Sequence, residues 1–300
     1  MIYFILGPQY HGVRLLSALL NHHPQILAMG RTNPARAHDE RCSCGEKVSA
    51  CEFWNHIKDS IPYEKELVWK YMMPSYPLIV ENHFINKTIV FVLCVLAKFL
   101  GSGVWNISKK AKIFKETYEA YITACREWFY CDAIFDGEND VLKYMVCSTM
   151  DLPVSGVIHV RRDPRGFAKA YLEQMESRPL NEITKEWAKA HDVIQKRLKF
   201  FPSERVLAMK YEELLQKPQE YLMRFCKALG LEETPFLEYP IDARKNHMVG
   251  DDMPDVKNIR EYIVDLRGKE KAWRETISGV EKSSIARVAG PLLGAFGYKE

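Results

Sequence analysis

The chain has 300 residues, 47% of them hydrophobic, with 42 Lys or Arg against 39 Asp or Glu and a formal net charge of +3. This length suffices for one large α/β domain or two small ones, with a substantial core. So small a net charge excludes a generally basic surface of the kind that binds nucleic acid, and any basic site has to be local.

No targeting or membrane segment is predicted. Strand-like sequence starts at Ile2, without a basic leader or a small-residue cleavage site, so we expect a cytoplasmic protein. The most apolar stretch, Ile89–Ala97, is interrupted by Lys98 and is too short for a bilayer span, which takes ~20 residues. We interpret it as a buried helix, with a membrane-surface helix as the second interpretation. The eight cysteines are expected to be mostly free thiols.

The first 24 residues predict a strand, a glycine loop and a helix. An apolar run, Ile2–Leu6, stops at Gly7-Pro8, and a short polar loop containing Gly12 leads into the helical pattern Leu15–Leu20. Such a loop aims backbone N–H groups and the positive end of a helix dipole at an anion. The sequence therefore predicts a phosphate-binding loop, although a plain strand-to-helix turn fits the two glycines equally well.

This loop differs from that of the nucleotide hydrolases. Their motif, G-x-x-x-x-G-K-[ST], needs a lysine on the phosphates and a hydroxyl on Mg²⁺. Gly7 and Gly12 have the right spacing, but Val13 and Arg14 occupy the Lys and Ser/Thr positions. An ATPase, a GTPase or a kinase is therefore disfavoured.

Strands and helices alternate along the rest of the chain, after a loop-rich insertion at about 31–82. This alternation predicts an α/β fold, a parallel sheet flanked by helices, in a single domain over residues 1–300. Ligands of such a sheet bind beyond the carboxyl ends of its strands. The later elements predicted are a helix over Ser108–Tyr130, strands over Ala133–Phe135 and Gly156–Val160, a helix through Tyr171, an amphipathic helix over 183–199, a strand over Arg205–Lys210, a helix to about Leu229 and a last helix from Val280 to Gly297. In the first of these helices, one apolar stripe contains Phe114, Tyr118, Tyr121, Ile122, Cys125 and Trp128.

A cluster of arginines follows the predicted strand in mid-chain. Arg162 lies just past the strand end, where its guanidinium can bind a phosphate bidentately, a contact worth ~1.5–3 kcal/mol. Asp163 is placed to cap a helix that starts at Pro164. Arg161 and Arg165 are interpreted as solvated charges. Because this cluster and the first loop fall on the same edge of the sheet, a ligand with phosphates at two separated positions would fit both.

Three segments, in this order, resemble the sulfotransferases that use 3′-phosphoadenosine 5′-phosphosulfate (PAPS). Phe4–Leu16 (FILGPQYHGVRLL) is similar to the family's 5′-phosphosulfate loop, Val157–Tyr171 (VIHVRRDPRGFAKAY) to its 3′-phosphate motif, and Met209–Pro218 (MKYEELLQKP) to its Y-E-D-L motif. The resemblance covers nearly the whole chain and is closest to bacterial members. It implies a P-loop-like sulfotransferase fold, with PAPS as co-substrate and no metal required.

The resemblance implies a role for each matching position. Arg162 would bind the 3′-phosphate, and Arg267 and Lys269 would add to that site. Tyr211 would lie near the adenine, although a tyrosine after a strand is more often a packing residue. The residues that would wrap the 5′-phosphosulfate are Gly7, Pro8, Gln9, Tyr10, His11, Gly12, Val13 and Arg14.

Several positions depart from the family pattern, and they concern the chemistry. Tyr10 stands where the loop has its cation, Ala170 where a serine binds the 3′-phosphate, and Asn139 where a bacterial motif has a lysine. Arg14 and His11 are the local replacements. Arg14 can turn inward as a cation and His11 can act as acid, base or donor near neutral pH, or both are solvated loop residues.

Sulfuryl transfer depends on positioning, on stabilisation of charge and on a base that takes the acceptor's proton. Asp136 follows a predicted strand on the functional edge and is a possible base, or else a helix cap or turn residue. The catalytic candidates are therefore His11, Arg14 and Asp136.

The spacing Cys42-x-Cys44…Cys51 is a weak zinc signal, since one residue between the first two cysteines is unusual and His38 is the nearest fourth ligand. Free thiols or one disulfide are favoured, and no residue is assigned to a metal.

The sequence thus predicts a sulfotransferase that moves a sulfuryl group from PAPS to a hydroxyl or amine of a small molecule, lipid or saccharide. The alternative is a catalytically degenerate sulfotransferase-like protein that binds a nucleotide or a partner. Neither nucleic acid nor a membrane span is expected. The acceptor and the oligomeric state stay open.

Overall fold

The computed structural model describes residues 1–30, 40–62, 76–174, 178–238, 241–245, 247–249 and 258–299. At its centre lies a five-stranded sheet in the order β2-β3-β1-β4-β5, and every neighbouring pair of strands is parallel. The predicted α/β fold, a parallel sheet flanked by helices, is confirmed. The strands are β1 (Ile2–Leu6), β2 (Ile26–Ala28), β3 (Ala133–Asp136), β4 (Val154–Arg161) and β5 (Val206–Lys210).

The central strand, β1, is buried on both faces. Ile2 and Phe4 belong to one hydrophobic cluster, whereas Tyr3 and Ile5 belong to another. Successive side chains of a strand point to opposite faces, so each face of β1 contributes to a separate core. This burial explains why β1 is an unbroken apolar run, as is usual for parallel strands covered on both sides.

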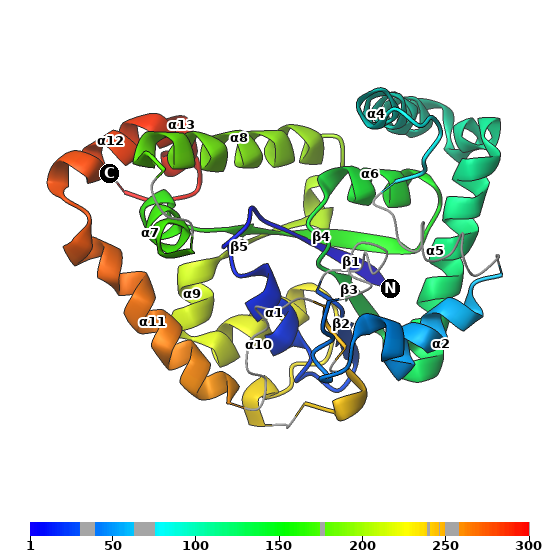
Figure 1. Cartoon of the computed structure of the whole chain (residues 1–300), viewed down its shortest axis with the longest axis horizontal. Helices are drawn as coiled ribbons and strands as arrows, with labels where there is room; N and C mark the ends of the chain where they lie inside the picture. The colour runs from blue at the N-terminus through cyan, green and yellow to red at the C-terminus, as the bar shows by residue number, and fades with distance from the viewer. Residues whose placement is uncertain are drawn as a thin grey trace.

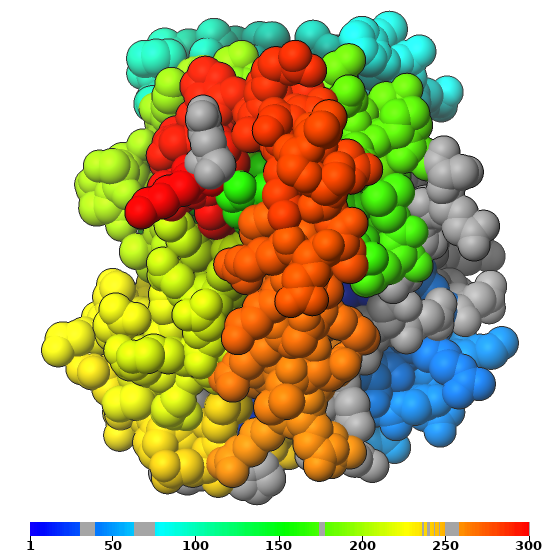
Figure 2. Space-filling model, turned by 90° about the vertical axis from the view of Figure 1, so that its left-hand side faces the viewer, coloured from blue at the N-terminus to red at the C-terminus, as the bar shows by residue number. Residues whose placement is uncertain are grey.

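The α-helices are α1 (Val13–Leu20), α2 (Glu52–Ser60), α4 (His83–Leu100), α5 (Lys109–Trp128), α6 (Val141–Thr149), α7 (Pro164–Gln174), α8 (Leu180–Leu198), α9 (Tyr211–Gln216), α10 (Pro218–Ala228), α11 (Ile259–Thr276), α12 (Gly279–Ala289) and α13 (Pro291–Ala295). Short 3₁₀ helices are η1 (Val48–Ala50), η2 (Ser102–Ile107), η3 (Ser203–Arg205), η4 (Phe236–Glu238) and η5 (Ala243–Lys245). Figure 1 shows α1, α9 and α10 below the sheet and α6 and α8 above it. In Figure 2, α11 runs as an orange ridge down the middle of a face to which α12 contributes at one end.

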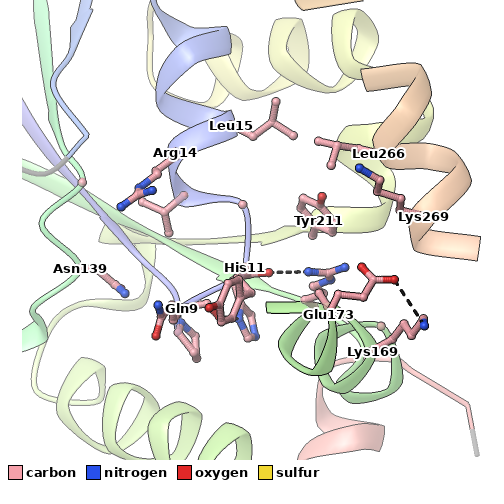
Figure 3. A pocket seen from close by; sticks show the side chains of 18 of the residues that line it. Gln9, His11, Arg14, Leu15, Asn139, Lys169, Glu173, Tyr211, Leu266 and Lys269 are labelled. Carbon is pink, nitrogen blue, oxygen red and sulfur yellow. Dashed lines mark hydrogen bonds and ion pairs between the residues drawn. The ribbon is translucent and has the colours of Figure 1, made fainter. Parts of the chain in front are cut away.

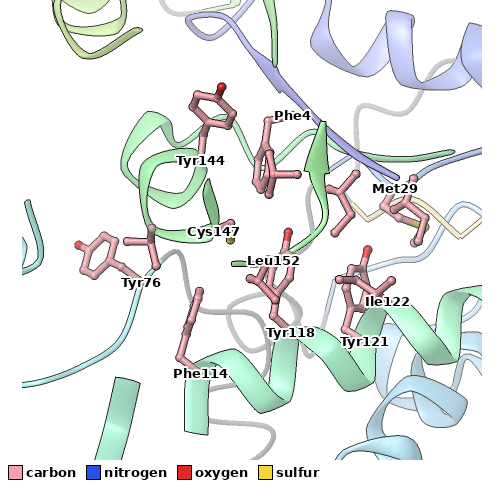
Figure 4. Packing of buried hydrophobic residues seen from close by; sticks show 14 of the residues in the cluster. Phe4, Met29, Tyr76, Phe114, Tyr118, Tyr121, Ile122, Tyr144, Cys147 and Leu152 are labelled. Carbon is pink, nitrogen blue, oxygen red and sulfur yellow. The ribbon is translucent and has the colours of Figure 1, made fainter. Parts of the chain in front are cut away.

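The larger core cluster lies between β1, α5 and α6 (Figure 4). The rings of Phe4 and Tyr144 meet edge to face with centroids 5.6 Å apart, a favourable aromatic geometry. The helix predicted over Ser108–Tyr130 is confirmed as α5. Its predicted apolar stripe faces this core and contains the buried side chains of Phe114, Tyr118, Tyr121, Ile122 and Cys125.

Two of the predicted helices are each divided in the structure. The helix expected up to Leu229 is divided into α9 and α10 at Lys217, because Pro218 lacks an N–H and suits the first turn of a new helix. The helix expected at the C-terminal end is divided into α12 and α13 at Gly290, whose φ of +55° interrupts the helix before Pro291.

The insertion at 31–82 is more ordered than a loop in its described part. Residues 40–62 contain η1 and α2, and α2 buries Phe53, Trp54 and Ile57 against the core. The predicted loop-rich insertion therefore contains one α-helix, α2, while 31–39 and 63–75 lie outside the described residues.

The helix α4 is longer and more exposed than predicted. It has 18 residues, is long and apolar enough to cross a membrane by length and composition alone, and has 28% of those residues buried. Phe84, Phe99 and Leu100 are 80%, 75% and 72% exposed, while Val90 and Cys94 pack on the core. The prediction of a short, mostly buried helix is wrong, because the apolar pattern extends around the helix and only one stripe of it meets the protein.

Candidate functional site

A cavity of about 580 Å³ lies beyond the carboxyl ends of the central strands. Its walls are the loop after β1, the turn after β3, and residues of α1, α7, α9 and α11 (Figure 3). The chain leaves β1 toward β2 and β3 on one side and later forms β4 and β5 on the other, so the cavity occupies the topological switch point of the sheet. Ligands of α/β proteins bind at that position.

The loop after β1 has an unusual backbone. Tyr10 and Gly12 both have a left-handed conformation, with φ of +63° and +80°. A Cβ at Gly12 would lie 2.4 Å from Cδ2 of Tyr211, so only glycine lets the Tyr211 ring lie against the loop. At the start of the loop, the Gly7 N–H donates to Oδ1 of Asn139 over 2.6 Å. The loop is thus held from β3 on one side and from α9 on the other.

The first turn of α1 faces the cavity. Gly12 is its N-cap residue and has no side chain with which to cap the helix, so the first N–H groups of α1 are available to an anion. Arg14 lies in this first turn and lines the cavity, half-buried. Figure 3 shows its guanidinium on the Asn139 side of the cavity, away from Lys269.

Arg162 is buried at the other end of the cavity, directly after β4. Its Nη1 donates to the Tyr10 carbonyl oxygen over 2.6 Å, and its guanidinium lies over the Tyr211 ring, 4.5 Å from the ring centroid. Its Nε donates to Oε2 of Glu270 over 3.0 Å, and Nη2 contacts the same oxygen. Arg162 therefore faces the loop, as the sequence predicts, but it already has a carboxylate partner.

Glu270 comes from α11 and is also buried. Burial raises the pKa of its carboxyl to about 7, against the Arg162 charge, which lowers it. Its second oxygen, Oε1, has no hydrogen-bond partner among the described residues. Two other cations of the cavity also have carboxylate partners: Lys169 pairs with Glu173 at 3.4 Å and Lys269 with Asp265 at 2.7 Å.

The Tyr-Glu-Glu segment at the start of α9 connects the two ends of the cavity. Tyr211 packs on Gly12 and under Arg162. Glu212 accepts from the Asp163 N–H over 2.7 Å, and so ties α9 to the start of α7. Asp163 accepts from the Arg165 N–H over 2.9 Å, which confirms its predicted capping role.

His11 does not face solvent. It is fully buried, with Nδ1 donating to the Gln9 carbonyl over 3.0 Å and Nε2 lying 2.9 Å from Nε2 of His191. His191 in turn meets Nε2 of His159 through its Nδ1, at 2.9 Å. Because a carbonyl can only accept, the protons of this histidine chain are fixed: His191 donates to His11, and His159 donates to His191.

The histidine chain is neutral at neutral pH. Burial lowers the pKa of His11 and of His159 to about 3, and that of His191 well below 6.5. The structure therefore gives no support to His11 as an acid or base, nor as a solvated loop residue, because its ring is part of the interior.

Asp136 is likewise buried, and its carboxylate already has partners. Its carboxylate forms an ion pair of 2.8 Å with Lys143, accepts from the Tyr118 hydroxyl over 2.5 Å, and is 0% exposed. Asp136 is absent from the lining of the cavity, so the structure does not favour it as the base or as a helix cap. It acts instead as the counter-ion of a buried lysine from α6.

Of the two further residues predicted for the 3′-phosphate site, one lines the cavity and the other does not. Lys269 lines the cavity, whereas Arg267 lies in a separate cavity of about 220 Å³, where it donates to the carbonyls of Leu215 and Gln216. Arg267 therefore caps the end of α9 and does not reach the Arg162 site. Arg165 is not a solvated charge, because it pairs with Asp163 at 2.8 Å and packs on a tryptophan ring.

Comparison with known proteins gives one match to a family and several matches to a fold. Residues 143–235, which include Arg162 and Tyr211, match the model of the sulfotransferase family. The first loop, where the sulfotransferase pattern is altered, precedes the matched stretch. No curated protein matches the sequence.

Two solved sulfotransferase domains share this fold. The sulfotransferase domain from the Synechococcus PCC 7002 olefin synthase has a TM-score of 0.55 and 15% identity, over 100% of this chain and 95% of that domain. The sulfotransferase domain from the curacin biosynthetic pathway has a TM-score of 0.53 and 14% identity, over 100% and 98% of the two chains. At such identities the likeness concerns the sulfotransferase fold alone.

Sequence reasoning missed the partners that come from distant elements. Glu270 follows the predicted Lys269 directly, yet nothing in its sequence position indicates an ion pair with Arg162. His159 falls on an unspecified position of the 3′-phosphate motif, and His191 lies outside the three motif segments, so neither was singled out. The three cysteines at 42, 44 and 51 are brought together with His247, a fourth candidate ligand that the sequence did not indicate, whereas His38 lies outside the described residues.

Proposed function

We propose that the chain is a PAPS-dependent sulfotransferase whose donor binds in the 580 Å³ cavity. The observation that carries the proposal is the direct contact of Arg162 with the first loop, which brings a guanidinium and an uncapped helix terminus to one cavity. Support also comes from the size of the cavity, since ligand sites measure about 300–1,000 Å³.

The two ends of the cavity would bind different phosphate groups of the donor. The N–H groups at the start of α1, with Arg14, would bind the 5′-phosphosulfate, and Arg162 would bind the 3′-phosphate. Tyr211 would provide an aromatic wall between the two. Ala170 offers no hydroxyl to the 3′-phosphate, so Arg162 and Lys269 would provide the charge there.

The reaction requires little covalent catalysis by the protein. The bond between sulfur and the bridging oxygen of the 5′-phosphosulfate breaks, a bond from sulfur to the acceptor oxygen or nitrogen forms, and the acceptor loses a proton. Negative charge grows on the bridging oxygen, which leaves with 3′-phosphoadenosine 5′-phosphate (PAP). By analogy with phosphoryl transfer, positioned cations and N–H groups stabilise that charge, and Arg14 is the cation of the first turn.

The acceptor would be a hydroxyl or amine of a small molecule, lipid or saccharide, and the cytoplasmic location expected from the sequence stays part of the proposal. The second candidate is a non-catalytic nucleotide- or partner-binding protein. The ion pair between Arg162 and Glu270 favours it, because a 3′-phosphate has to compete with a carboxylate that is already in place.

Calorimetric titration with PAP tests the proposal. We expect submicromolar binding by the wild type and a loss of about 10- to 150-fold in Arg162→Ala, since a charge-assisted contact is worth ~1.5–3 kcal/mol. Arg287→Ala, an exposed arginine of α12 that does not line the cavity, is the control and should bind as the wild type does. Absence of binding by the folded wild type contradicts both candidates as nucleotide binders.

Transfer of labelled sulfuryl from PAPS to a panel of hydroxyl and amine acceptors separates the two candidates. Turnover supports the enzyme. Tight binding of PAP without transfer to any acceptor class, and without slow hydrolysis of PAPS, favours the binding protein.

A further inference from the structure

Four potential metal ligands meet in a second place, and none of them lines the proposed nucleotide cavity. This Cys/His cluster consists of Cys42, Cys44, Cys51 and His247, whose ligand atoms all lie within 4.8 Å of one another. The sulfurs come from residues 40–62 and the imidazole from residues 247–249, so the cluster joins segments about 200 positions apart in the sequence.

Four distances within the cluster match those of a tetrahedral zinc site. Cys51 Sγ lies 3.7 Å from Sγ of Cys42 and 3.7 Å from Sγ of Cys44. His247 Nδ1 lies 3.3 Å from Sγ of Cys51 and 3.7 Å from Sγ of Cys42. With Zn–S of about 2.3 Å and Zn–N of about 2.0–2.1 Å, a regular tetrahedron separates two sulfurs by about 3.8 Å and a sulfur from a nitrogen by about 3.6 Å.

These separations do not describe disulfides. A disulfide holds its sulfurs about 2.0 Å apart, and all eight cysteines of the chain are free. Hydrophobic packing does not explain the arrangement either, because three thiols and one imidazole nitrogen converge on a single point.

We propose that the Cys/His cluster binds one zinc ion, which fastens the insertion that carries α2 to the segment before α11. The ligand set is Cys₃His, which is one of the common sets of structural zinc sites, and soft thiolates disfavour Mg²⁺ and Ca²⁺. On binding, three thiols release their protons to solvent and Nδ1 of His247 donates its lone pair to the metal. Three thiolates and Zn²⁺ leave the site with a net charge of −1.

The backbone around the cysteines is already arranged for a metal. Cys42 starts a tight turn in which Gly45 donates to the Cys42 carbonyl over 2.9 Å, and Gly45 has a φ of +102° that glycine tolerates. The turn aims Sγ of Cys42 and Cys44 to one side. Cys51 is the N-cap residue of α2, where the helix dipole stabilises a thiolate.

The histidine ligand is held by its neighbours. The His247 ring stacks on Phe53, with centroids 4.9 Å apart and an interplanar angle of 14°, and meets Trp128 edge to face. Next to it, the Met248 N–H donates to Oγ of Ser43 over 3.0 Å, and the Ser43 N–H donates to the Met248 carbonyl over 2.8 Å. The two segments that share the metal are therefore also paired through their backbones.

The site has four protein ligands and no open position, so its role is structural rather than catalytic. It nevertheless lies close to the nucleotide cavity. Met248 packs on Gly30, with Cγ about 3.5 Å from where a Cβ would lie, and the Gly30 carbonyl accepts from the Gly137 N–H over 2.8 Å. Gly137 lines the cavity. The metal thus stabilises one edge of the cavity indirectly, because Met248 contacts Gly30 and Gly30 is hydrogen-bonded to Gly137.

Elemental analysis of the wild type, purified under reducing conditions and dialysed against Zn²⁺ and then against buffer, tests the proposal directly. We expect about one zinc ion per chain. Exchange of the metal for Co²⁺ should give the visible d–d bands and thiolate charge-transfer bands of a tetrahedral site. Removal by a strong chelator should lower the thermal midpoint, and added Zn²⁺ should restore it.

Variants identify the ligands. Cys42→Ser with Cys51→Ser, and His247→Ala, should lower the bound zinc at least about tenfold, whereas Cys226→Ala removes a buried cysteine of α10 and should keep it. His247→Cys and Cys44→His should retain zinc, because Cys₄ and Cys₂His₂ are also zinc ligand sets. If these side chains only packed against their neighbours, exchanging histidine for cysteine or cysteine for histidine would not preserve zinc binding.

Two results overturn the proposal. One is a folded wild type that holds less than about 0.1 zinc per chain after this dialysis and gives no tetrahedral Co²⁺ spectrum. The other is a disulfide between two of the three cysteines in protein kept under reducing conditions, found by peptide mapping. Both measurements use the wild type, so they remain decisive if a variant fails to fold, and neither depends on the proposed transferase activity.

Discussion

The loop end and the Arg162 end of the cavity differ in which features suited to an anion they contain. At the loop end the backbone keeps its shape, with glycine where Tyr211 lies and an uncapped helix facing the cavity. Its side chains have other partners, since His11 points into a chain of buried histidines. At the other end the side chain is kept: Arg162 faces the loop, but Glu270 already neutralises it.

This difference indicates which end of the cavity determines the affinity for an anionic ligand. Among substitutions, only proline removes a backbone N–H, so the loop end keeps a preference for anions through most changes of its side chains. The Arg162 end depends on two ionisable groups and so responds to pH and to single substitutions. Affinity should therefore be set at the Arg162 end, and the stability of the loop by the histidines beneath it.

The largest expected effect is on folding, at the histidine chain. His191→Ala leaves the Nε2 atoms of His11 and His159 buried without partners, and each orphan costs about 1–3 kcal/mol. We expect the free energy of unfolding to fall by about 4 kcal/mol. Urea denaturation measures it, with Lys189→Ala, an exposed residue of the same helix, as the control. A loss below about 1 kcal/mol would mean that the histidines do not support the loop.

The same chain predicts how stability depends on pH. The three histidines have pKa values below the 6.5 of an unfolded chain, so the unfolded state binds more protons as pH falls below 6.5, and stability is lost from there downward. Glu270, with a pKa raised from 4.5 to about 7, gains stability over the same range. Each fully titrating group contributes about 1.4 kcal/mol per pH unit, so three histidines outweigh one glutamate. Unfolding curves between pH 7 and pH 5 should show a net loss.

The next effect concerns catalysis at the loop end. If Arg14 stabilises the bridging oxygen, Arg14→Ala should lower kcat by about 100- to 1,000-fold while PAP affinity changes little, because that charge develops in the transition state. Sulfuryl transfer kinetics, paired with calorimetry on the same protein, measure both quantities. Arg14→Lys should recover part of the rate. An equal loss in kcat and in PAP affinity would assign Arg14 to ground-state binding instead.

At the Arg162 end, Glu270→Gln removes the competing charge and keeps the shape of the side chain. PAP should bind about tenfold more tightly, the size expected for one charge pair of about 1.4 kcal/mol near a partly solvated site. In the wild type, affinity should rise as pH falls through about 7, because protonation of Glu270 frees Arg162. The variant should lose that part of the pH dependence, and Glu204→Gln, a remote exposed carboxylate, should keep it.

Much of the fold could be predicted from the sequence, because the patterns that indicate strands and helices involve neighbouring residues. The apolar runs of β1 and β4 and the apolar stripe of α5 depend on residues within a few positions of one another, and each was predicted. The exposed apolar face of α4 was not, because composition alone does not tell which side of a helix has a partner.

The candidate site is a different case, since its decisive contacts join distant segments. The position of Arg162 after a strand predicts that it faces the loop, and it does. The ion pair with Glu270 spans 108 positions, and the contact of His11 with His191 spans 180. No spacing rule relates residues so far apart, so the neutralised guanidinium and the buried imidazole appear only once the chain is folded.

The smallest expected effect separates Arg267 from the lysine two positions on. Arg267 donates to the carbonyls of Leu215 and Gln216 in the smaller cavity, whereas Lys269 lines the larger one. Arg267→Ala should change PAP affinity less than about twofold, while Lys269→Ala should weaken it about threefold, because an exposed charge pair is worth ~0.2–1 kcal/mol. Calorimetry at low and high salt measures both, and only the Lys269 effect should shrink as salt screens it. If instead Arg267→Ala weakened PAP as strongly as Arg162→Ala, α11 would have to rotate when nucleotide binds, and the Arg162–Glu270 pair would have to open with it.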